Sequence, residues 1–475
     1  MLNSTMLAAL LICSAAAWLE SAAPAHAQVL DIGSRLEPFV DDWLIERMEG
    51  AVLRLHPPVP REVVMAFDRP WEGNVSAYVT VFPDGDIFRM YYRGAHYDWA
   101  SKEVTHEVAC YAESTDGIHW TRPELGLCEF GGSKRNNIVW TGVGCHNFTP
   151  FRDANPSCRP EARYKALATG EGGLVAFQSP DGIRWSLIQN EPVITKGAFD
   201  SQNLGFWDPV RGRYVEFHRG FRDGVRDIMT STSEDFTHWT DPQWLDFGEA
   251  PPEHLYTNAV TPYFRAPHVF LGFPKRFMPD RKKVDEHPSP GLSDGVFMTS
   301  RDGLHWHRFL EAFVRPGLQR ERWWERNNMT AWGILVTRPE IAGLPDELSI
   351  YSSESYYEDG NRLRRFTLRM DGFVSVHAPF AGGEFVTRPL RFEGKQLLLN
   401  YSTSAAGSVR VEISDEAGQP IPGFALGDCP EAYGDSVEEP VRWRGGTDVS
   451  ALAGRVVRLR FVLKDADLYA IRFAP

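Results

Sequence analysis

Five asparagines, each with a titratable residue just before it, are the residues of this sequence whose types and spacing best suit chemistry. They stand in the stretches Glu72-Gly73-Asn74 and His146-Asn147, in residues 200–203 and 253–258, and in Arg326-Asn327-Asn328. Gathered at one place, such side chains would offer hydrogen-bond donors and acceptors to the hydroxyls of a carbohydrate. Glycoside hydrolysis would further need two carboxyl groups about 5 to 9.5 Å apart, one protonated and one ionised.

A repeated motif supplies the frame that could gather them. The sequences STDGIHW, SPDGIRW, SEDFTHW and SRDGLHW begin at Ser114, Ser179, Ser233 and Ser300. An Asp followed by Gly favours a tight turn, and the Trp opens a strand that packs back over the hairpin. The regular spacing predicts one supersecondary unit per copy, with the motif at the outer hairpin of a propeller blade. We therefore expect the aspartates of the repeat to be structural.

The strands around each turn complete the predicted blades. Each copy follows one strand and, before it, a hairpin of two more, and a fifth unit without the motif follows from residue 330 onward. The sequence thus predicts an all-β protein with a five-bladed β-propeller over residues 72–378. In a propeller the first strand of each blade starts at the face to which the second strand returns, so these ends converge on one funnel. The candidate substrate-binding residues at these ends are Asn74, Arg93, Asn147, Asn203, Arg219, His254, Asn258, Arg276, Asp294, Arg326, Asn328 and Glu354.

The sequence outside the predicted propeller shows a different pattern of apolar and polar residues. Residues 379–475 alternate apolar and polar side chains, as in VRVEISD and RVVRLRFVL, which predicts an antiparallel β-sandwich. Residues 28–71 read as an N-terminal strand and a proline-rich arm that packs on the propeller.

The N-terminus predicts export. Residues 1–27 contain a short apolar run that ends at Ala25-His26-Ala27, the small-x-small pattern of a signal-peptidase site. We expect a periplasmic or extracellular protein without a later membrane span. The net charge of −13 and the lack of a basic run argue against a nucleic-acid partner. Nothing in the sequence indicates the oligomeric state.

Five cysteines remain after the predicted signal peptide. They are Cys110, Cys128, Cys145, Cys158 and Cys429, and none of them forms a Cys-x-x-Cys pair. Cys145 and Cys158 could bridge one hairpin, and buried free thiols are an equal alternative.

Several motifs carry a family resemblance. They are Phe39-Val40-Asp41-Asp42, Pro70-Trp71-Glu72-Gly73, residues 90–94 (MYYRG) and residues 114–123, in which Arg122-Pro123 follows the first repeat. On these residues the chain resembles the five-bladed propeller glycosidases of the invertase and arabinanase type, whose invertase-like members also carry a C-terminal β-sandwich. The resemblance implies a base or nucleophile near Glu72 and an acid near Asp200, with Glu253 as the alternative acid. The chain departs from the family pattern where Glu72-Gly73-Asn74 replaces the Asn-Asp-Pro-Asn of invertases.

The resulting hypothesis is an exported glycoside hydrolase acting on an oligo- or polysaccharide through carboxylates in the funnel. The arginines there favour an anionic glycan, and a non-catalytic carbohydrate-binding propeller is the main alternative. A sialidase-like enzyme with an arginine clamp is a weaker one, because the repeat is one residue shorter than the sialidase motif and only five blades are visible. No cofactor or metal is predicted; an oxygen-rich channel could hold Ca²⁺, although no dedicated calcium loop is visible.

Overall fold

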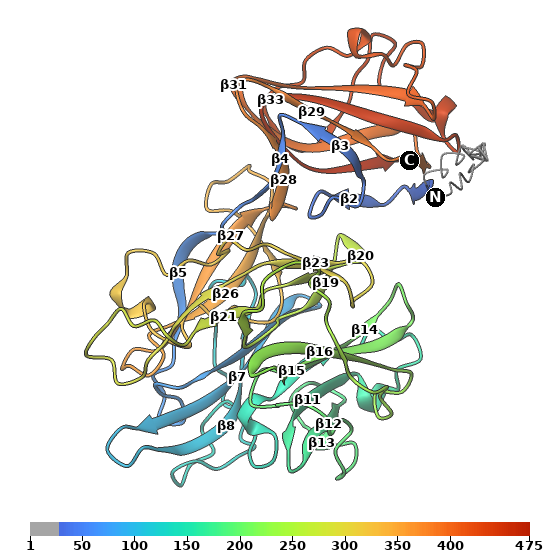
Figure 1. The fold of residues 1–475 in the computed structure, drawn as a ribbon. Helices are drawn as coiled ribbons and strands as arrows, with labels where there is room; N and C mark the ends of the chain where they lie inside the picture. Colours follow the sequence, from blue (N-terminus) through green and yellow to red (C-terminus); the bar gives the residue numbers. More distant parts are fainter. Residues whose placement is uncertain (1–27) are drawn as a thin grey trace, which may run out of the picture.

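The structure, a computed structural model, describes residues 28–475, so the predicted signal peptide lies outside the described residues. The chain folds into a five-bladed β-propeller and a β-sandwich, the lower and upper bodies in Figure 1. This architecture confirms the predicted fold class. Helical structure in the described part is limited to the short 3-10 helices η1 (Cys145–Asn147), η2 (Pro160–Ala162), η3 (Arg320–Arg322), η4 (Leu426–Asp428) and η5 (Ser450–Leu452). None of the helices in residues 28–475 has the length and apolar character needed to span a membrane.

Blades one to three are regular four-stranded antiparallel sheets in which each strand pairs with the next one along the chain. Blade one consists of β6 (Ala77–Asp84), β7 (Ile87–Asp98), β8 (Glu103–Ser114) and β9 (Ile138–Trp140). Blade two consists of β10 (Thr149–Arg152), β11 (Tyr164–Gly170), β12 (Gly173–Ser179) and β13 (Ser186–Leu187). Blade three consists of β14 (Leu204–Asp208), β15 (Arg213–Arg222), β16 (Val225–Ser233) and β17 (Gln243–Trp244).

Blade four is split into two short sheets along the direction of its strands. One half holds β19 (Thr261–Tyr263), β20 (Ala266–Gly272), β23 (Met298–Ser300) and β24 (Trp306–Arg308). The other half holds β18 (His254–Leu255), β21 (Lys275–Met278) and β22 (Leu292–Gly295). Pro274, between β20 and β21, has no backbone N–H to donate to a ladder, which fits the interruption of the second strand there.

The fifth blade takes its outer strand from the other end of the chain. It consists of β25 (Leu335–Thr337), β26 (Glu347–Glu354), β27 (Arg362–Arg369) and β5 (Val59–Ala66), with β5 antiparallel to β27. The fifth unit lacks the Asp-Gly-x-x-Trp turn that leads into an outer strand in the other blades. The N-terminal strand β5 covers the edge of β27 that would otherwise stay open.

The repeated motif builds the same turn four times and confirms the structural role expected for its aspartates. In the first copy Asp116 Oδ1 accepts the backbone N–H groups of Ile118 and His119 at 2.8 Å each, and Trp120 Nε1 donates to Gly117 O. The third copy has Phe236 where the others have Gly, in the left-handed region at φ 71°. Its fully buried ring packs on Tyr214 and Trp239, which offsets this strained conformation.

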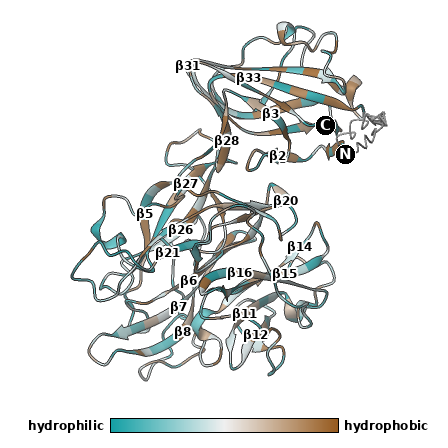
Figure 2. Cartoon of the chain, viewed as in Figure 1, coloured by the Kyte–Doolittle hydropathy of each residue, from teal (hydrophilic) through white to brown (hydrophobic). Residues whose placement is uncertain are grey.

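The sandwich is built around two long strands that bend. β31 (Gln396–Asp415) and β33 (Val457–Ala474) pair over most of their length, with a register shift between Thr403 and Ser408. The other strands are β1 (Leu30–Gly33), β2 (Leu36–Pro38), β3 (Ile45–Glu49), β4 (Val52–Leu55), β28 (Val374–Ala378), β29 (Gly383–Thr387), β30 (Leu390–Phe392) and β32 (Asp435–Pro440). Figure 2 shows hydrophobic and hydrophilic residues alternating along β33, as a strand with one buried face requires.

The N-terminal segment differs from the predicted arm on the propeller. β1 to β4 pair with strands of the C-terminal sheet, for example β2 with β33, and only β5 belongs to the propeller. β28, expected within the propeller, also pairs with β33. The physical reason is hydrophobic packing: Phe39, just after β2, packs its ring edge on Phe385 and Phe461 of the sandwich core.

The sandwich contacts the propeller at the ends of blades four and five. Arg301 pairs with Glu37 and Asp41 at 3.0 and 2.8 Å, and Arg369 pairs with Asp435 at 2.6 Å. Arg301 and Arg369 lie where the third strands of their blades end, and such ends are opposite the face at which the first strands start. The sandwich therefore lies at the end of the propeller opposite the predicted funnel.

The five cysteines of the described residues are all free, with Cys110, Cys145 and Cys429 buried. Of the two alternatives from the sequence, free thiols are therefore the one observed.

Candidate functional site

Side chains from all five blades meet at one end of the central channel, and we call this place the funnel. Asp200 and His146 come from the segments before the first strands of blades three and two, and Tyr256 comes from the first strand region of blade four. Tyr78 of blade one donates to or accepts from Tyr256 at 2.8 Å, while Arg93 of the same blade donates to Tyr356 of blade five at 2.8 Å. The convergence expected from propeller geometry is thus present.

The central feature of the funnel is a chain of three groups. The ring of His146 lies between two carboxylates, with Nε2 3.1 Å from Asp200 Oδ1 and Nδ1 2.8 Å from Glu107 Oε1. Glu107 lies in the first half of β8, the third strand of blade one. The side chain of Asp200 is 63% exposed, whereas those of His146 and Glu107 are largely covered. Asp200 is therefore the member of the chain that a ligand entering the funnel can reach.

The groups of this chain shift the pKa values of one another. The hydrogen bond from His146 holds the pKa of Asp200 far below its usual range. Burial would raise the pKa of Glu107, but His146 and the guanidinium of Arg93 lower it below the usual value. Burial would lower the pKa of His146, but its bonds to Asp200 and Glu107 raise it. Near neutral pH the arrangement favours two carboxylates joined by an imidazolium that donates from both nitrogens.

Tyrosine hydroxyls surround the exposed carboxylate. The hydroxyls of Tyr78 and Tyr256 lie 3.5 and 3.4 Å from Asp200 Oδ1, and both tyrosines are almost fully buried. Burial raises the pKa of each, so they are neutral donors at ordinary pH. Tyr78 has φ 53°, and Arg326 and Tyr357 nearby have φ 64° and 72°, conformations that residues with a Cβ rarely adopt. Such strain gathers at functional sites, where surrounding contacts hold it in place.

Four cations lie beside the tyrosines. Lys275 Nζ is 4.1 Å from the ring centre of Tyr256, and the guanidinium of Arg219 is 5.0 Å from the same ring. Arg326 lies over Tyr356 and Tyr357, at 5.6 and 5.3 Å. Arg93 lies over Tyr78 at 4.8 Å. The funnel is therefore lined by aromatic faces and positive charge around one exposed carboxylate.

The five asparagines occupy the places expected of them, but their side chains bond mostly to the protein itself. Asn74, for example, donates to Tyr97 O and accepts Tyr97 N–H, and thereby ties the start of the first strand to the second. The other four also donate to backbone carbonyls: Asn147, Asn203, Asn258 and Asn328. All five are buried, so their geometry indicates backbone anchors at the rim of the channel.

Two of the three candidate catalytic carboxylates are held by arginines. Glu72 is buried against Arg122 at 2.9 Å and accepts the hydroxyl of Tyr92 at 2.6 Å; burial raises its pKa. Glu253 bonds to Arg276 at 3.1 Å and to Arg308. Asp200 alone among the three is exposed in the funnel.

The remaining candidates divide between the funnel and its surroundings. Arg93, Arg219 and Arg326 lie with Asp200, as described. Arg276 and Asp294 form a two-bond ion pair, at 2.7 and 2.9 Å, and Glu354 is buried between Arg362 and Arg364. His254 accepts the backbone N–H of Arg226 at 3.2 Å. The polar groups of these last four residues are bonded to other groups of the protein.

Sequence reasoning missed the tyrosines, Glu107 and the role of His146. Glu107 lies near the funnel end of a third strand. The predicted propeller could have pointed to it, because third strands also start at the funnel face. Tyr256 stands inside the stretch 253–258 that the frame did mark. The buried position of Tyr78 beside Asp200 has no local signal in the sequence. Within residues 28–475, no group of three or more His, Cys, Asp or Glu side chains is placed to hold a metal ion.

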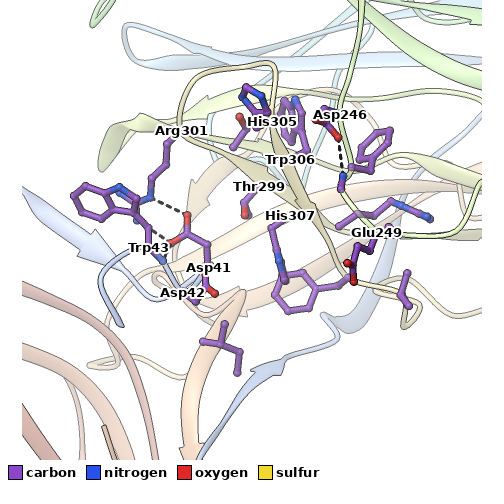
Figure 3. Close-up of a pocket in the computed structure, with 18 of the residues that line it drawn as sticks. Asp41, Asp42, Trp43, Asp246, Glu249, Thr299, Arg301, His305, Trp306 and His307 are labelled. Atoms are coloured by element: carbon purple, nitrogen blue, oxygen red, sulfur yellow. Dashed lines mark hydrogen bonds and ion pairs between the residues drawn. The ribbon is translucent and has the colours of Figure 1, made fainter. Parts of the chain in front are cut away.

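Two cavities lie away from the funnel residues. At the opposite end of the channel, a cavity of about 570 Å³ is lined largely by apolar side chains such as Phe206, Pro262 and Trp332. A cavity of about 950 Å³ lies between blade four and the sandwich. Figure 3 shows that in this second cavity Asp41 points to Arg301, which also stacks on Trp43 at 4.1 Å. These contacts join the two bodies of the protein, and Asp41 also accepts the N–H of Trp43 in a turn.

Comparisons with known proteins give similarity of structure only. No protein-family model and no curated protein matches the sequence. A solved structure titled "Glycoside hydrolase" is similar with a TM-score of 0.44 and 13% identity, over 68% of this chain and 95% of that one. An N-acetylgalactosamine deacetylase from F. plautii has a TM-score of 0.42 and 13% identity, over 68% and 94%. A fructofuranosidase from Schwanniomyces occidentalis has a TM-score of 0.38 and 10% identity, over 86% and 96%. Similarity at this level concerns the arrangement of strands.

Proposed function

We propose that this protein is a glycoside hydrolase acting on an oligo- or polysaccharide, with Asp200 as its reactive carboxylate. The observation that carries this proposal is the Glu107–His146–Asp200 chain, which ends in an exposed, ionised carboxylate at the convergence of five blades. Export to the periplasm or beyond, expected from the N-terminal residues, would bring such an enzyme to its polymeric substrate.

The geometry places the three groups in a row, with the ring of His146 filling the space between Glu107 and Asp200. A sugar therefore meets this chain at its exposed end, Asp200. Asp200 then activates the attacking water or stabilises the oxocarbenium-like sugar. The protonated His146 is the neighbouring group that carries a transferable proton, and Glu107 positions it and supports its charge. The hydroxyls of Tyr78 and Tyr256 are placed to donate to the sugar or to Asp200.

This assignment gives no chemical step to Glu72 or Glu253, because both are engaged by arginines. The sialidase-like alternative needs an arginine clamp. Arg276 is paired with Asp294 and Glu253, and Arg93 is bonded to Val75 O and Tyr356, so Arg219 and Arg326 are the two funnel arginines left for such a clamp.

A non-catalytic glycan-binding propeller is the second candidate, and one observation favours it. The pKa of Asp200 and that of Glu107 are both lowered, so neither funnel carboxyl group is available as a protonated acid. If His146 does not supply the proton, the funnel would bind sugars without cleaving them.

Release of reducing sugar from a panel of neutral, uronic and sulfated polysaccharides tests the proposal. We expect turnover of at least one polysaccharide and a loss of about 10²- to 10⁴-fold in Asp200→Asn, the usual size of an acid–base contribution. Asp86→Asn is the matched control, because Asp86 is exposed in the β6–β7 turn at the other end of the channel. Undiminished turnover in Asp200→Asn would refute the site. Glycan binding by the wild type without any turnover would favour the second candidate.

A further inference from the structure

Lys275 is a buried cation that the protein itself does not neutralise. Lys275 is 1% exposed. Its backbone is held in place by Tyr256, whose N–H donates to Lys275 O at 2.8 Å. Among residues 28–475 its ammonium has neither a hydrogen-bond acceptor nor a carboxylate partner, and its near neighbours are the rings of Tyr256 and Phe277 at 4.1 and 5.8 Å. Buried charges in proteins are normally paired, because an unpaired one loses its hydration without compensation.

The surroundings add positive charge instead of removing it. Burial lowers the pKa of Lys275 most strongly, and Arg326, Arg226 and Arg219 lower it further, while Glu325 opposes them. Glu325 is itself shared with Arg326, at 3.8 Å. Only Nε of Arg219 is bonded in the described chain, to Ala198 O at 3.0 Å. The cluster therefore holds more cationic groups than the protein supplies with acceptors.

Arg93 shows what a structural cation in the same funnel looks like. It is also buried, but its guanidinium donates to Val75 O and the Tyr356 hydroxyl at 2.7 and 2.8 Å and lies 3.5 Å from Glu107. Both terminal nitrogens of Arg93 thus have partners and only its Nε is unbonded, whereas no acceptor bonds the ammonium of Lys275 within the described chain. The difference separates a group that holds the funnel together from one that is open to a ligand.

From this contrast we propose that Lys275, with Arg219 and Arg326, forms an oxyanion subsite that receives a carboxylate or a sulfate group of the glycan. The subsite rests on the proposed function for its place in a reaction, because it lies beside Asp200. Tyr256 connects the two: its ring faces Lys275, and its hydroxyl lies 3.4 Å from Asp200 Oδ1. The anionic group is thus on the sugar at the reactive carboxylate or on the sugar next to it. A strongly hydrated ammonium suits either oxyanion as a point charge, and the arginines add directed N–H donors.

Isothermal titration calorimetry of the mature chain with small sugars tests the subsite. The probes are D-glucuronate, glucose 6-sulfate and glucose, which share a ring and differ in charge. We expect at least one anionic probe to bind the wild type tenfold or more tightly than glucose does. A preference for glucuronate identifies a carboxylate as the natural group, and a preference for the 6-sulfate identifies a sulfate ester. Equal binding of all three probes would overturn the proposal.

Variants then test whether Lys275 and the arginines cause the preference for anionic probes. Lys275→Met keeps most of the side-chain length, removes a charge that has no partner, and should bring the affinity for the anionic probe down to that for glucose. Lys464→Met is the matched control, because Lys464 also lies over an aromatic ring, Phe380 at 4.5 Å, but on the sandwich. If Lys275→Met fails to fold, Arg219→Met decides the matter by the same measurement. Retention of the full anion preference in the folded variant would show that the cation is only structural.

Asp200→Asn separates this proposal from the proposed function. It should lose hydrolysis and keep the preference for the anionic probe, since it leaves Lys275 and the arginines in place. Hydrolysis that survives Asp200→Asn would overturn the catalytic assignment of Asp200. The calorimetry would still test the anion subsite independently. Conversely, loss of hydrolysis together with equal binding of charged and neutral probes would leave the catalytic carboxylate standing and remove the subsite.

Discussion

Replacement of Lys275 by Met should stabilise the free protein, and most strongly at low pH. Burial of Lys275 among other cations lowers its pKa from the usual 10.5 to about 7. A pKa lowered by that amount corresponds to about 5 kcal/mol of destabilisation when the ammonium must stay charged in the folded state. This value is an upper limit for the gain from Lys275→Met at pH 6, because water and neighbouring side chains rearrange around a buried charge.

The sign of the pH dependence follows from proton binding. Between pH 7 and 10.5 the unfolded chain keeps the Lys275 proton and the folded chain releases it, so the free energy of unfolding of the wild type rises with pH through this window. Below pH 7 both states are protonated and the full destabilisation remains. In Lys275→Met this contribution is absent at every pH, so the stability difference between variant and wild type should shrink from pH 6 to pH 10.

Differential scanning calorimetry of both proteins at pH 6, 8 and 10, in a buffer without sulfate or phosphate, measures the difference. The propeller transition of Lys275→Met should lie above that of the wild type by several degrees at pH 6 and approach it at pH 10. Lys464→Met should show no such trend. A variant that is less stable than the wild type at pH 6, or a difference that does not change with pH, would refute the reasoning.

Three other predictions concern separate contacts. Hydrolysis should decline as the pH rises through the raised pKa of His146, seen in the pH profile of kcat/KM; a flat alkaline limb would contradict His146 as proton donor. Arg122→Met should lower the free energy of unfolding by about 3 to 5 kcal/mol, because it leaves Glu72 buried without its partner. The double variant Arg122→Met/Glu72→Gln should recover part of this loss in denaturant titrations, and no recovery would argue against the pair. Phe236→Gly should relieve the positive φ yet still lower Tm, since the lost ring costs about 3 to 5 kcal/mol; an unchanged Tm would show that backbone strain dominates.

The fold was accessible from the sequence because its strongest signal is local. An Asp-Gly-x-x-Trp turn forms from contacts within seven residues, so four copies could be recognised and counted without knowledge of the rest of the chain. The pairing of β5 with β27 joins segments some 300 residues apart, and no local pattern announces it. The same holds for β1 to β4, whose short strands complete a sheet made mainly by the C-terminal residues.

The candidate site was predictable in position but less so in composition. The propeller frame led to Asp200 and to Arg93, Arg219 and Arg326, which do lie together. It also led to five asparagines whose amides bond to backbone groups. Backbone N–H and C=O groups at strand ends need hydrogen-bond partners, and an asparagine placed there can serve this need instead of binding a ligand. Whether a polar group is already bonded depends on contacts between blades. Lys275 and Tyr256 gain their significance from the same contacts, so the sequence alone could not single them out.

The closure of the fifth blade by β5 also governs how the protein can be assembled. During synthesis β5 must wait for β27, and β2 must wait for β33 at the far end of the chain. Contacts of such high sequence separation raise the contact order and slow folding, so an emerging chain would expose open strand edges until the last residues are made. A cut near residue 379 would leave β1, β2 and β3 without the strands they pair with. The propeller and sandwich are therefore a single unit for expression and engineering, although each has its own core.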